Sequence, residues 1–282
     1  MKIHATLLLA AATVFGSQVA GATTLGLSIS LTSLDSSICT GASLDCTETS
    51  TDIVPIAISY SRSFESAFDE FSTSEIPLSG GRTAHQSASG LGSNPPLTGS
   101  DPDPVFAFLP PVNITAEQFA TGTDGVVNEA FFVNAGKVVI TQPDGGISRS
   151  LVSGDLFESQ QWATRLSDGA WVSSQYSVQF SLFSAHVPMT VDDVATPMTF
   201  GEFQTRLEQQ YFSGGDIPVY LGYVWYDGEN SFEEIDSYSG VAHITSLNGL
   251  APVPEAPAPL SMLAGLLVVG VRLFGASAKR RV

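Results

Sequence analysis

Within the predicted strand 171–183, residues 176–182 alternate strictly between apolar and polar side chains, and this period of two is the feature that most limits the fold of the chain. Tyr176, Val178, Phe180 and Leu182 occupy every second position. Successive side chains of a β-strand point to opposite faces of its sheet, so this segment is expected to bury one face and expose the other. The chain is therefore expected to be built around a sheet.

Similar but shorter patterns occur along the chain, separated by polar turns at 134–136, 143–146 and 167–169. Short strands joined by glycine-containing turns favour a mainly β fold, and we expect an antiparallel β-sandwich or jelly-roll-like domain with one or two short helices. The other predicted strands are 24–34, 53–60, 130–133, 137–141, 147–152, 162–166, 219–226 and 241–247.

One segment has helical periodicity instead. Thr199 and Glu202 have the spacing of a capping box, and apolar residues then recur at helical intervals as far as Tyr211. This predicts a helix over 199–211 that packs on the sheet. A second set with helical spacing is Phe64, Phe68 and Phe71.

The stretch from Gly80 to Pro104 is dense in Gly, Ser, Asn and Pro, which predicts a long loop or linker. We divide the chain into a signal peptide (1–22), an extracytoplasmic β-rich domain (23–252) and a C-terminal sorting segment (253–282).

The N-terminal segment has the order of a secretory signal peptide. Lys2 precedes an apolar stretch from Leu7 to Phe15, and small residues follow up to Ala20 and Ala22. This order predicts export, with cleavage by signal peptidase after Ala22.

The C-terminal segment also has three parts. Val253, Pro254, Glu255, Ala256 and Pro257 come first, an apolar stretch over 260–278 follows, and Lys279, Arg280 and Arg281 form a basic stop. A helix over 260–278 would rise about 28 Å, close to the roughly 30 Å hydrocarbon core of a bilayer. We therefore expect a transmembrane helix there, with its basic end on the cytoplasmic side.

These three parts resemble the PEP-CTERM sorting signal. In that family the membrane-embedded enzyme exosortase recognises a Pro-Glu-Pro motif, removes the tail and releases or transfers the protein to the exterior. Here Ala256 stands where the family usually has its second proline, and Pro257 follows one place later. The resemblance covers residues 253–282 only. A plain single-pass anchor is the alternative.

The charge of the body excludes one class of partner. Residues 23–254 contain six basic and 27 acidic residues, a formal charge of −21, which would repel nucleic acid. The two cysteines, Cys39 and Cys46, are expected to form a local disulfide in an exported chain. The alternative, a zinc site, lacks further ligands nearby.

Catalytic and cofactor motifs are not evident. His85, His186 and His243 lack metal-ligand spacing, and Ser87-Ala88-Ser89-Gly90 lacks the leading glycine of a nucleophile elbow. We expect no cofactor, although Asp101-Pro102-Asp103 and Asp192-Asp193 offer oxygen ligands suited to calcium. The sequon Asn113-Ile114-Thr115 is attributed to chance.

Aromatic residues near the predicted strands allow two interpretations, because they can fill the core or stack on sugar rings if they lie on an exposed sheet face. Taken together, the sequence predicts a non-enzymatic protein of the cell surface or exopolysaccharide matrix of a Gram-negative bacterium, with a structural or adhesive role. A carbohydrate-binding module and a secreted hydrolase are the alternatives. The aromatic candidates are Trp162, Trp171, Trp225, Tyr223 and Tyr226.

Overall fold

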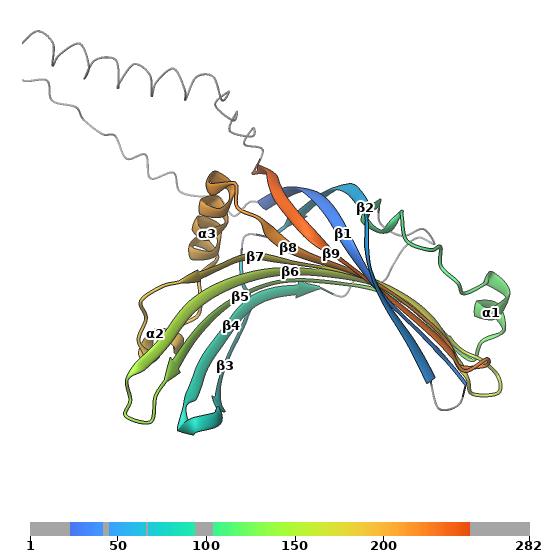
Figure 1. The fold of residues 1–282 in the computed structure, drawn as a ribbon, viewed down its shortest axis with the longest axis horizontal. Helices are drawn as coiled ribbons and strands as arrows, with labels where there is room; N and C mark the ends of the chain where they lie inside the picture. Colours follow the sequence, from blue (N-terminus) through green and yellow to red (C-terminus); the bar gives the residue numbers. More distant parts are fainter. Residues whose placement is uncertain (1–22, 42–44, 66, 94–103, 249–282) are drawn as a thin grey trace, which may run out of the picture.

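The computed structural model describes residues 23–41, 45–65, 67–93 and 104–248. They form one nine-stranded antiparallel sheet with three helices and two 3-10 turns, so the mainly β prediction is confirmed (Figure 1). The elements are β1 (Thr23–Thr40), β2 (Asp45–Phe64), β3 (Glu70–Pro77), η1 (Ser79–Gly81), β4 (Thr83–Ser93), η2 (Pro104–Phe106), α1 (Ala116–Thr121), β5 (Asp124–Thr141), β6 (Ile147–Arg165), β7 (Trp171–His186), α2 (Val191–Val194), α3 (Phe200–Ser213), β8 (Ile217–Asp227) and β9 (Phe232–Leu247).

The strand order is β2-β1-β9-β8-β7-β6-β5-β4-β3. Strands β3 to β9 therefore follow one another as a meander, and β9 then pairs with β1, with Leu25 opposite Leu247. Strands β2 and β3, the two edges of the sheet, are consecutive in the chain. The short connection over 65–69 can join these opposite edges only because the sheet curls.

This curl replaces the two facing sheets that a sandwich would have. Figure 1 shows β1 and β2 lying above the middle of the sheet. Tyr60 of β2 accordingly meets Phe180 of β7, with 5.0 Å between the ring centroids. Strands of 16 to 20 residues accumulate enough twist for one sheet to cover part of its own face. Neighbouring strands are also joined directly rather than in jelly-roll order.

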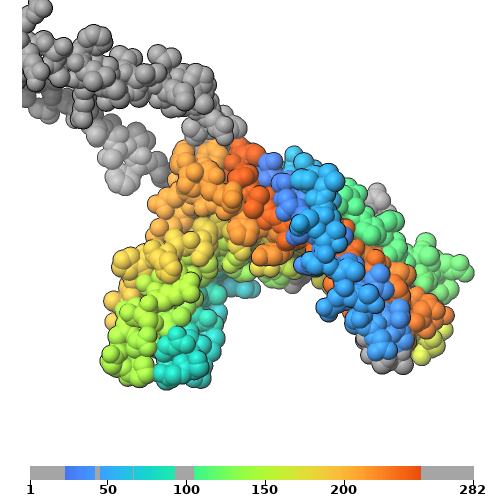
Figure 2. All heavy atoms as spheres, in the orientation of Figure 1, coloured from blue at the N-terminus to red at the C-terminus, as the bar shows by residue number. Residues whose placement is uncertain are grey.

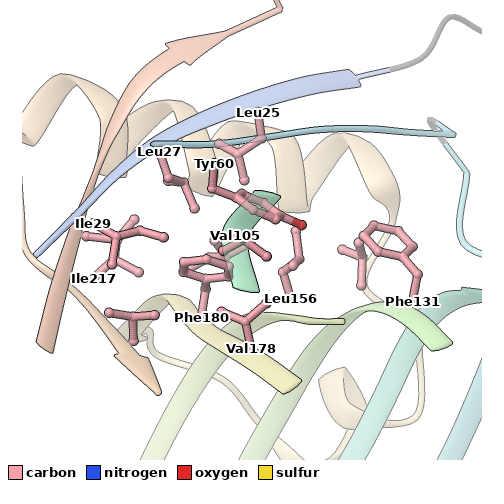
Figure 3. Close-up of a cluster of buried hydrophobic side chains, with 14 of the residues drawn as sticks. Leu25, Leu27, Ile29, Tyr60, Val105, Phe131, Leu156, Val178, Phe180 and Ile217 are labelled. Atoms are coloured by element: carbon pink, nitrogen blue, oxygen red, sulfur yellow. The ribbon is translucent and has the colours of Figure 1, made fainter. Parts of the chain in front are cut away.

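The core fills the space enclosed by this curl. Figure 3 shows side chains of β1 and β2 above and of β6 and β7 below, meeting around Val105 of η2. In the segment 171–183, the apolar side chains that were expected to face the core do so: Tyr176, Val178, Phe180 and Leu182 are fully buried. The alternation therefore correctly predicted which side chains face the core.

Helix α3 covers this same face. Thr199 and Glu202 form the predicted capping box, and the helix ends at Gly214 in the left-handed conformation. Phe203 and Leu207 are fully buried against the sheet. The predicted helix is confirmed. Helices α1 and α2 were not predicted individually, although each also begins with a capping box.

Two predicted turns are confirmed and a third is wrong. Gly145 and Gly169 have positive φ values of 83° and 94° in the turns that precede β6 and β7. Residues 134–136, in contrast, lie within the continuous strand β5, where Gly136 pairs with Ser153. Flanking strands on both sides supply hydrogen-bond partners, and these outweigh the weak strand preference of Asn and Gly.

Two further expectations need correction. Residues 83–93 of the predicted loop form β4, because β3 and β5 pair with this Ser/Ala/Gly segment on its two sides; residues 94–103 lie outside the described part. The proposed helical set is also wrong. Phe64 ends β2 and Phe71 lies in β3, while Phe68 packs between them against Phe200.

The sheet also arches along its strands. The helices and η2 lie on the convex side of this arch (Figure 1). The space-filling view shows a broad hollow on the other side, between a wing formed by β3–β6 and a wing that includes β1 and β2 (Figure 2). The sheet thus has one covered face and one concave, uncovered face.

Among the described residues, no helix has both the length and the apolar character needed to cross a bilayer. The predicted signal peptide (1–22), the apolar segment 260–278 and the boundary at 252 lie outside the described residues.

Candidate functional site: a groove across the strands

The concave face carries a band of small residues that crosses five strands. Residues directly opposite each other on paired strands project to the same face, so the strand register identifies the band. Its members are Ala130 on β5, Ser159 on β6, Ser177 on β7, Gly222 on β8 and Ser237 on β9. We call this band the floor of the cross-strand groove.

The floor is low because its side chains are short. A Cβ atom at Gly222 would lie only 2.9 Å from Ser177 Oγ, so even an alanine there would displace a neighbour. Ser177 and Ser237 are partly exposed. The floor therefore presents hydroxyl groups and backbone to the hollow.

One wall lies two residues along each strand and is largely aromatic. Phe132, Phe157, Gln179 and Tyr220 are successive partners on β5 to β8. The rings of Phe132 and Phe157 stack with 6.3 Å between their centroids. Tyr220 is 52% exposed. This wall combines a large open aromatic surface with a side-chain amide.

The opposite wall is rich in side-chain amides. Asn128, Gln161 and Gln175 are partners on β5 to β7, and Val224 and Ile235 continue the row on β8 and β9. Four residues separate the two walls along each strand, or about 13 Å at 3.3 Å per residue. Figure 2 shows this side of the molecule open.

The groove continues onto β1 and β2. There a hollow of about 370 Å³ is lined by Ser237 and Ile235 together with Asp35, Glu48 and Ser50. Asp35 and Glu48 are exposed carboxylates. The central part of the groove is thus neutral, and its β1–β2 end is acidic.

The chemistry of the lining favours a hydroxylated ligand. An Asn or Gln amide donates through its nitrogen and accepts through its oxygen, and a serine hydroxyl does both. Aromatic rings offer apolar contact beside these groups. The groove can therefore hold a ligand that alternates hydroxyl groups with apolar C–H surface.

The predicted aromatic candidates divide between the two faces. Trp162 and Tyr223 are buried, and Trp225 packs on Phe232 with 5.0 Å between the centroids. These three residues belong to the covered side. Trp171, which is 39% exposed, and Tyr226 project from the concave face. The sugar-stacking interpretation therefore applies to these two alone of the five.

The segment that follows η2 shields the buried aromatic residues. Tyr176 donates its hydroxyl to the Pro110 carbonyl at 2.6 Å, and its ring stacks on Phe106. Burial raises the pKa of Tyr176 to about 12, and burial also raises the pKa of Tyr223. Asn113 donates its amide to the Tyr223 hydroxyl. The side chain of the sequon asparagine is therefore already engaged within the fold.

A second polar cluster lies at the seam between β2 and the middle of the sheet. Fully buried Glu158 accepts the Tyr60 hydroxyl at 2.8 Å and lies 3.7 Å from Arg62 Nε. Arg62 also pairs with Glu129 and stands over the Phe131 ring at 5.2 Å. Burial alone would lower the pKa of Arg62, but the carboxylates of Glu158 and Glu129 raise it.

Arg62 and Phe131 also line a cleft of about 650 Å³ at this seam. The carboxylates of Glu158 and Glu129 balance the guanidinium charge and hold the group in place. Glu158 is covered by Tyr60 and sits in a fully buried position, which a bulky substrate cannot reach. We therefore interpret this cluster as structural: its ion pairs hold β2 against the middle of the sheet.

The remaining candidates have local roles and do not converge. His85 contacts Glu75, His186 contacts the Ser150 carbonyl, and His243 contacts Asp216. In the described part of the chain, no cluster of three metal-ligating side chains occurs.

The calcium candidate Asp192-Asp193 belongs to no cluster of three possible metal ligands among the described residues. Asp193 of the pair Asp192-Asp193 caps α2 through Thr190, and these hydrogen bonds lower the pKa of Asp193. Residues 101–103 lie outside the described part.

The predicted disulfide is confirmed, since Cys39 and Cys46 are bonded across the β1–β2 hairpin, with 4.0 Å between their Cα atoms. The sorting residues Val253, Pro254, Glu255, Ala256, Pro257, Lys279, Arg280 and Arg281, and the cleavage-site residues Ala20 and Ala22, lie outside the described residues.

Comparison of the chain with protein-family models, with curated proteins and with solved structures gave no match in any of the three. The groove geometry is therefore the basis for assigning a role to the domain.

The groove was not predicted from the sequence. A signal was present, because the polar phase of 171–183 is Ser173, Gln175, Ser177 and Gln179, with neither a lysine nor a glutamate. An outer face in so acidic a chain would ordinarily carry charges. The uncharged amides and hydroxyls at these positions were therefore the sequence signal for this unusual face.

Proposed function

We propose that the chain is an exported, exosortase-processed protein of the cell surface or exopolysaccharide matrix, with an adhesive role. The observation that carries the adhesive role is the concave sheet face, which presents amides, hydroxyls and aromatic rings and which α1, α2 and α3 leave uncovered. A face of this kind suits reversible attachment to extracellular material, because many weak polar contacts act together across it.

The disulfide supports the exported part of the proposal. Cys39 and Cys46 lie at the tip of a hairpin, where Thr40 and Asp45 are exposed to solvent. Disulfides persist in oxidising compartments and are rare where thiols are kept reduced. The acidic body, with its formal charge of −21 over 23–254, additionally favours solubility outside the cell.

Fractionation of the native host tests the sorting step. We expect the protein in the surface or released fraction, with an intact mass that places its C-terminus near Pro254 and Glu255. Replacing both residues by Ala should leave the precursor membrane-inserted and uncut. Replacing Lys279, Arg280 and Arg281 by Ser should instead weaken membrane retention before processing, because the stop is lost.

The two sets of variants act as controls for each other, since they fail at different steps. A C-terminus at Val282 in the released protein of a host with active exosortase would refute processing. A precursor that stays in the cytoplasm would refute export itself.

A further inference from the structure

We propose that the cross-strand groove binds a neutral polysaccharide chain, which lies across the strands along the floor defined by Ser159, Ser177, Gly222 and Ser237. This inference rests on the proposed function, because it identifies what the adhesive face would hold. The proposed binding site lies on the concave face and does not include the Arg62–Glu158 cluster at the seam.

The two walls match the two kinds of surface on a sugar chain. Pyranose rings have hydroxyl groups around their edges and apolar C–H faces. Gln161 and Gln175 on one wall and Gln179 on the other can each donate and accept hydrogen bonds. Tyr220, half of whose side chain is exposed, offers a ring face for the apolar surface.

The length of the groove favours a polymer over a single sugar. Its floor crosses β5, β6, β7, β8 and β9 and continues into the hollow beside Asp35 and Ser50 on β1 and β2. Seven strands at about 4.8 Å spacing make a path of roughly 29 Å. The groove is also open along its side (Figure 2), so a long chain can enter without threading an end.

Charge selects the class of polymer. The neutral centre of the groove offers no cation for a uronate or sulfate group, and the acidic body would repel such a polyanion. At the acidic end, Asp35 and Glu48 can accept hydrogen bonds from sugar hydroxyls. A neutral chain is therefore compatible with both the uncharged centre and the acidic end of the groove.

Affinity electrophoresis of the exported, disulfide-bonded protein tests this inference. The gels would contain dextran, soluble mannan or hydroxyethylcellulose as neutral polymers, alginate as a polyuronate and chitosan as a polycation. We expect retardation by at least one neutral polymer that persists at high salt, because hydrogen bonds and ring contacts are screened little. We expect no retardation by alginate.

Variants then locate the site. Tyr220→Ala and Gln179→Ala should each weaken binding about fivefold, the loss expected for one aromatic or amide contact. Ser237→Trp should abolish binding by filling the floor. The matched control is Phe212→Ala, which removes an aromatic residue of 62% exposure from α3 on the convex side and should leave binding unchanged. Circular dichroism of each variant checks that the fold is intact.

Three results would overturn the inference: no retardation by any neutral polymer, unchanged binding in both Tyr220→Ala and Ser237→Trp, or an equal loss in Phe212→Ala. These outcomes are separate from the fractionation result. A protein that is exported and processed but ignores neutral polymers loses the inference and keeps the proposed function. If the protein binds neutral polymers but is never exported, the inference is kept and the proposed function is lost.

Discussion

Replacing Arg62 by Met is expected to destabilise the domain more than any comparable surface change. Arg62 lies between Glu129 and fully buried Glu158, and it holds the edge strand β2 above the middle of the sheet. Met keeps most of the aliphatic stem but removes the positive charge. The carboxylate of Glu158 would then remain buried, with the Tyr60 hydroxyl but without its countercharge.

The expected cost follows from the burial of the three groups. Breaking a fully buried ion pair costs about 3 to 5 kcal/mol. Arg62 is 29% exposed and Glu129 retains some contact with solvent, so water screens part of the loss. The Arg62 cation also leaves the face of Phe131, a further contribution of about 0.5 to 1 kcal/mol. We therefore expect a loss of about 2 to 3 kcal/mol at pH 7.

Thermal and urea unfolding at pH 7 measure this loss, which corresponds to roughly 5 to 10 °C in melting temperature.

The matched control is Arg149→Met, a loss of the same charge from an exposed position on β6. It should cost less than about 0.5 kcal/mol. If Arg62→Met costs no more than this control, the seam cluster does not hold β2 against the sheet.

Three further measurements test the fold. Replacing Cys39 and Cys46 together by Ser should lower the free energy of unfolding by about 2 kcal/mol, because the bond closes a short loop; free thiols in native exported protein would contradict the disulfide. Spectroscopic titration of the phenols should leave Tyr176, with its pKa near 12, neutral at pH 11. Unfolded tyrosines ionise near pH 10. The contribution of Tyr176 to stability should therefore be complete below pH 10 and lost as the pH rises through 12. Ionisation of Tyr176 near pH 10 would show that the segment after η2 does not cover its ring. Lys137→Met should remove the hydrogen bonds from Nζ to the carbonyls of Thr196 and Asp193 and speed amide exchange in α2, whereas unchanged exchange would mean that the lysine does not hold this helix.

Sequence patterns predicted elements well where local chemistry alone decides the conformation. The α3 capping box and the turns at Gly145 and Gly169 are such cases, because a side-chain hydrogen bond or a positive φ is needed there. Residues 134–136 have similar composition but form part of β5. The difference lies in the neighbouring strands β4 and β6, which turn signals in the sequence do not reveal.

The curl of the sheet could not be predicted from local patterns. It depends on pairing between β1 and β9, whose partners are distant in the chain; Leu27 and Ile244, for example, are 217 residues apart. Alternation shows which side chains share a face, but it does not show whether a second sheet or the same sheet covers that face. The prediction of a β-sandwich assumed a second sheet, which is the commoner arrangement.

The groove depends on register, which is still harder to predict. Its floor forms only because small residues on five strands align, and a shift of one residue on any strand would send a core side chain into the hollow. Register is set by turn lengths and by irregularities such as the one between Gly154 and Asp155 on β6. Arg62 and Glu158, in the same way, meet only through the curl.

The two ends of the described domain relate the groove to the proposed sorting route. Asn248 donates its backbone N–H to the Thr24 carbonyl at 2.8 Å, so the domain begins and ends at one place. In Figure 1 this place lies on the side of α3, opposite the hollow. A chain that continues to a membrane helix beyond residue 248 would therefore hold the precursor by the face that carries no groove. Under the proposed sorting route, the point where the chain leaves the domain therefore does not cover the concave face. On this geometry, attachment to the matrix does not have to wait for release.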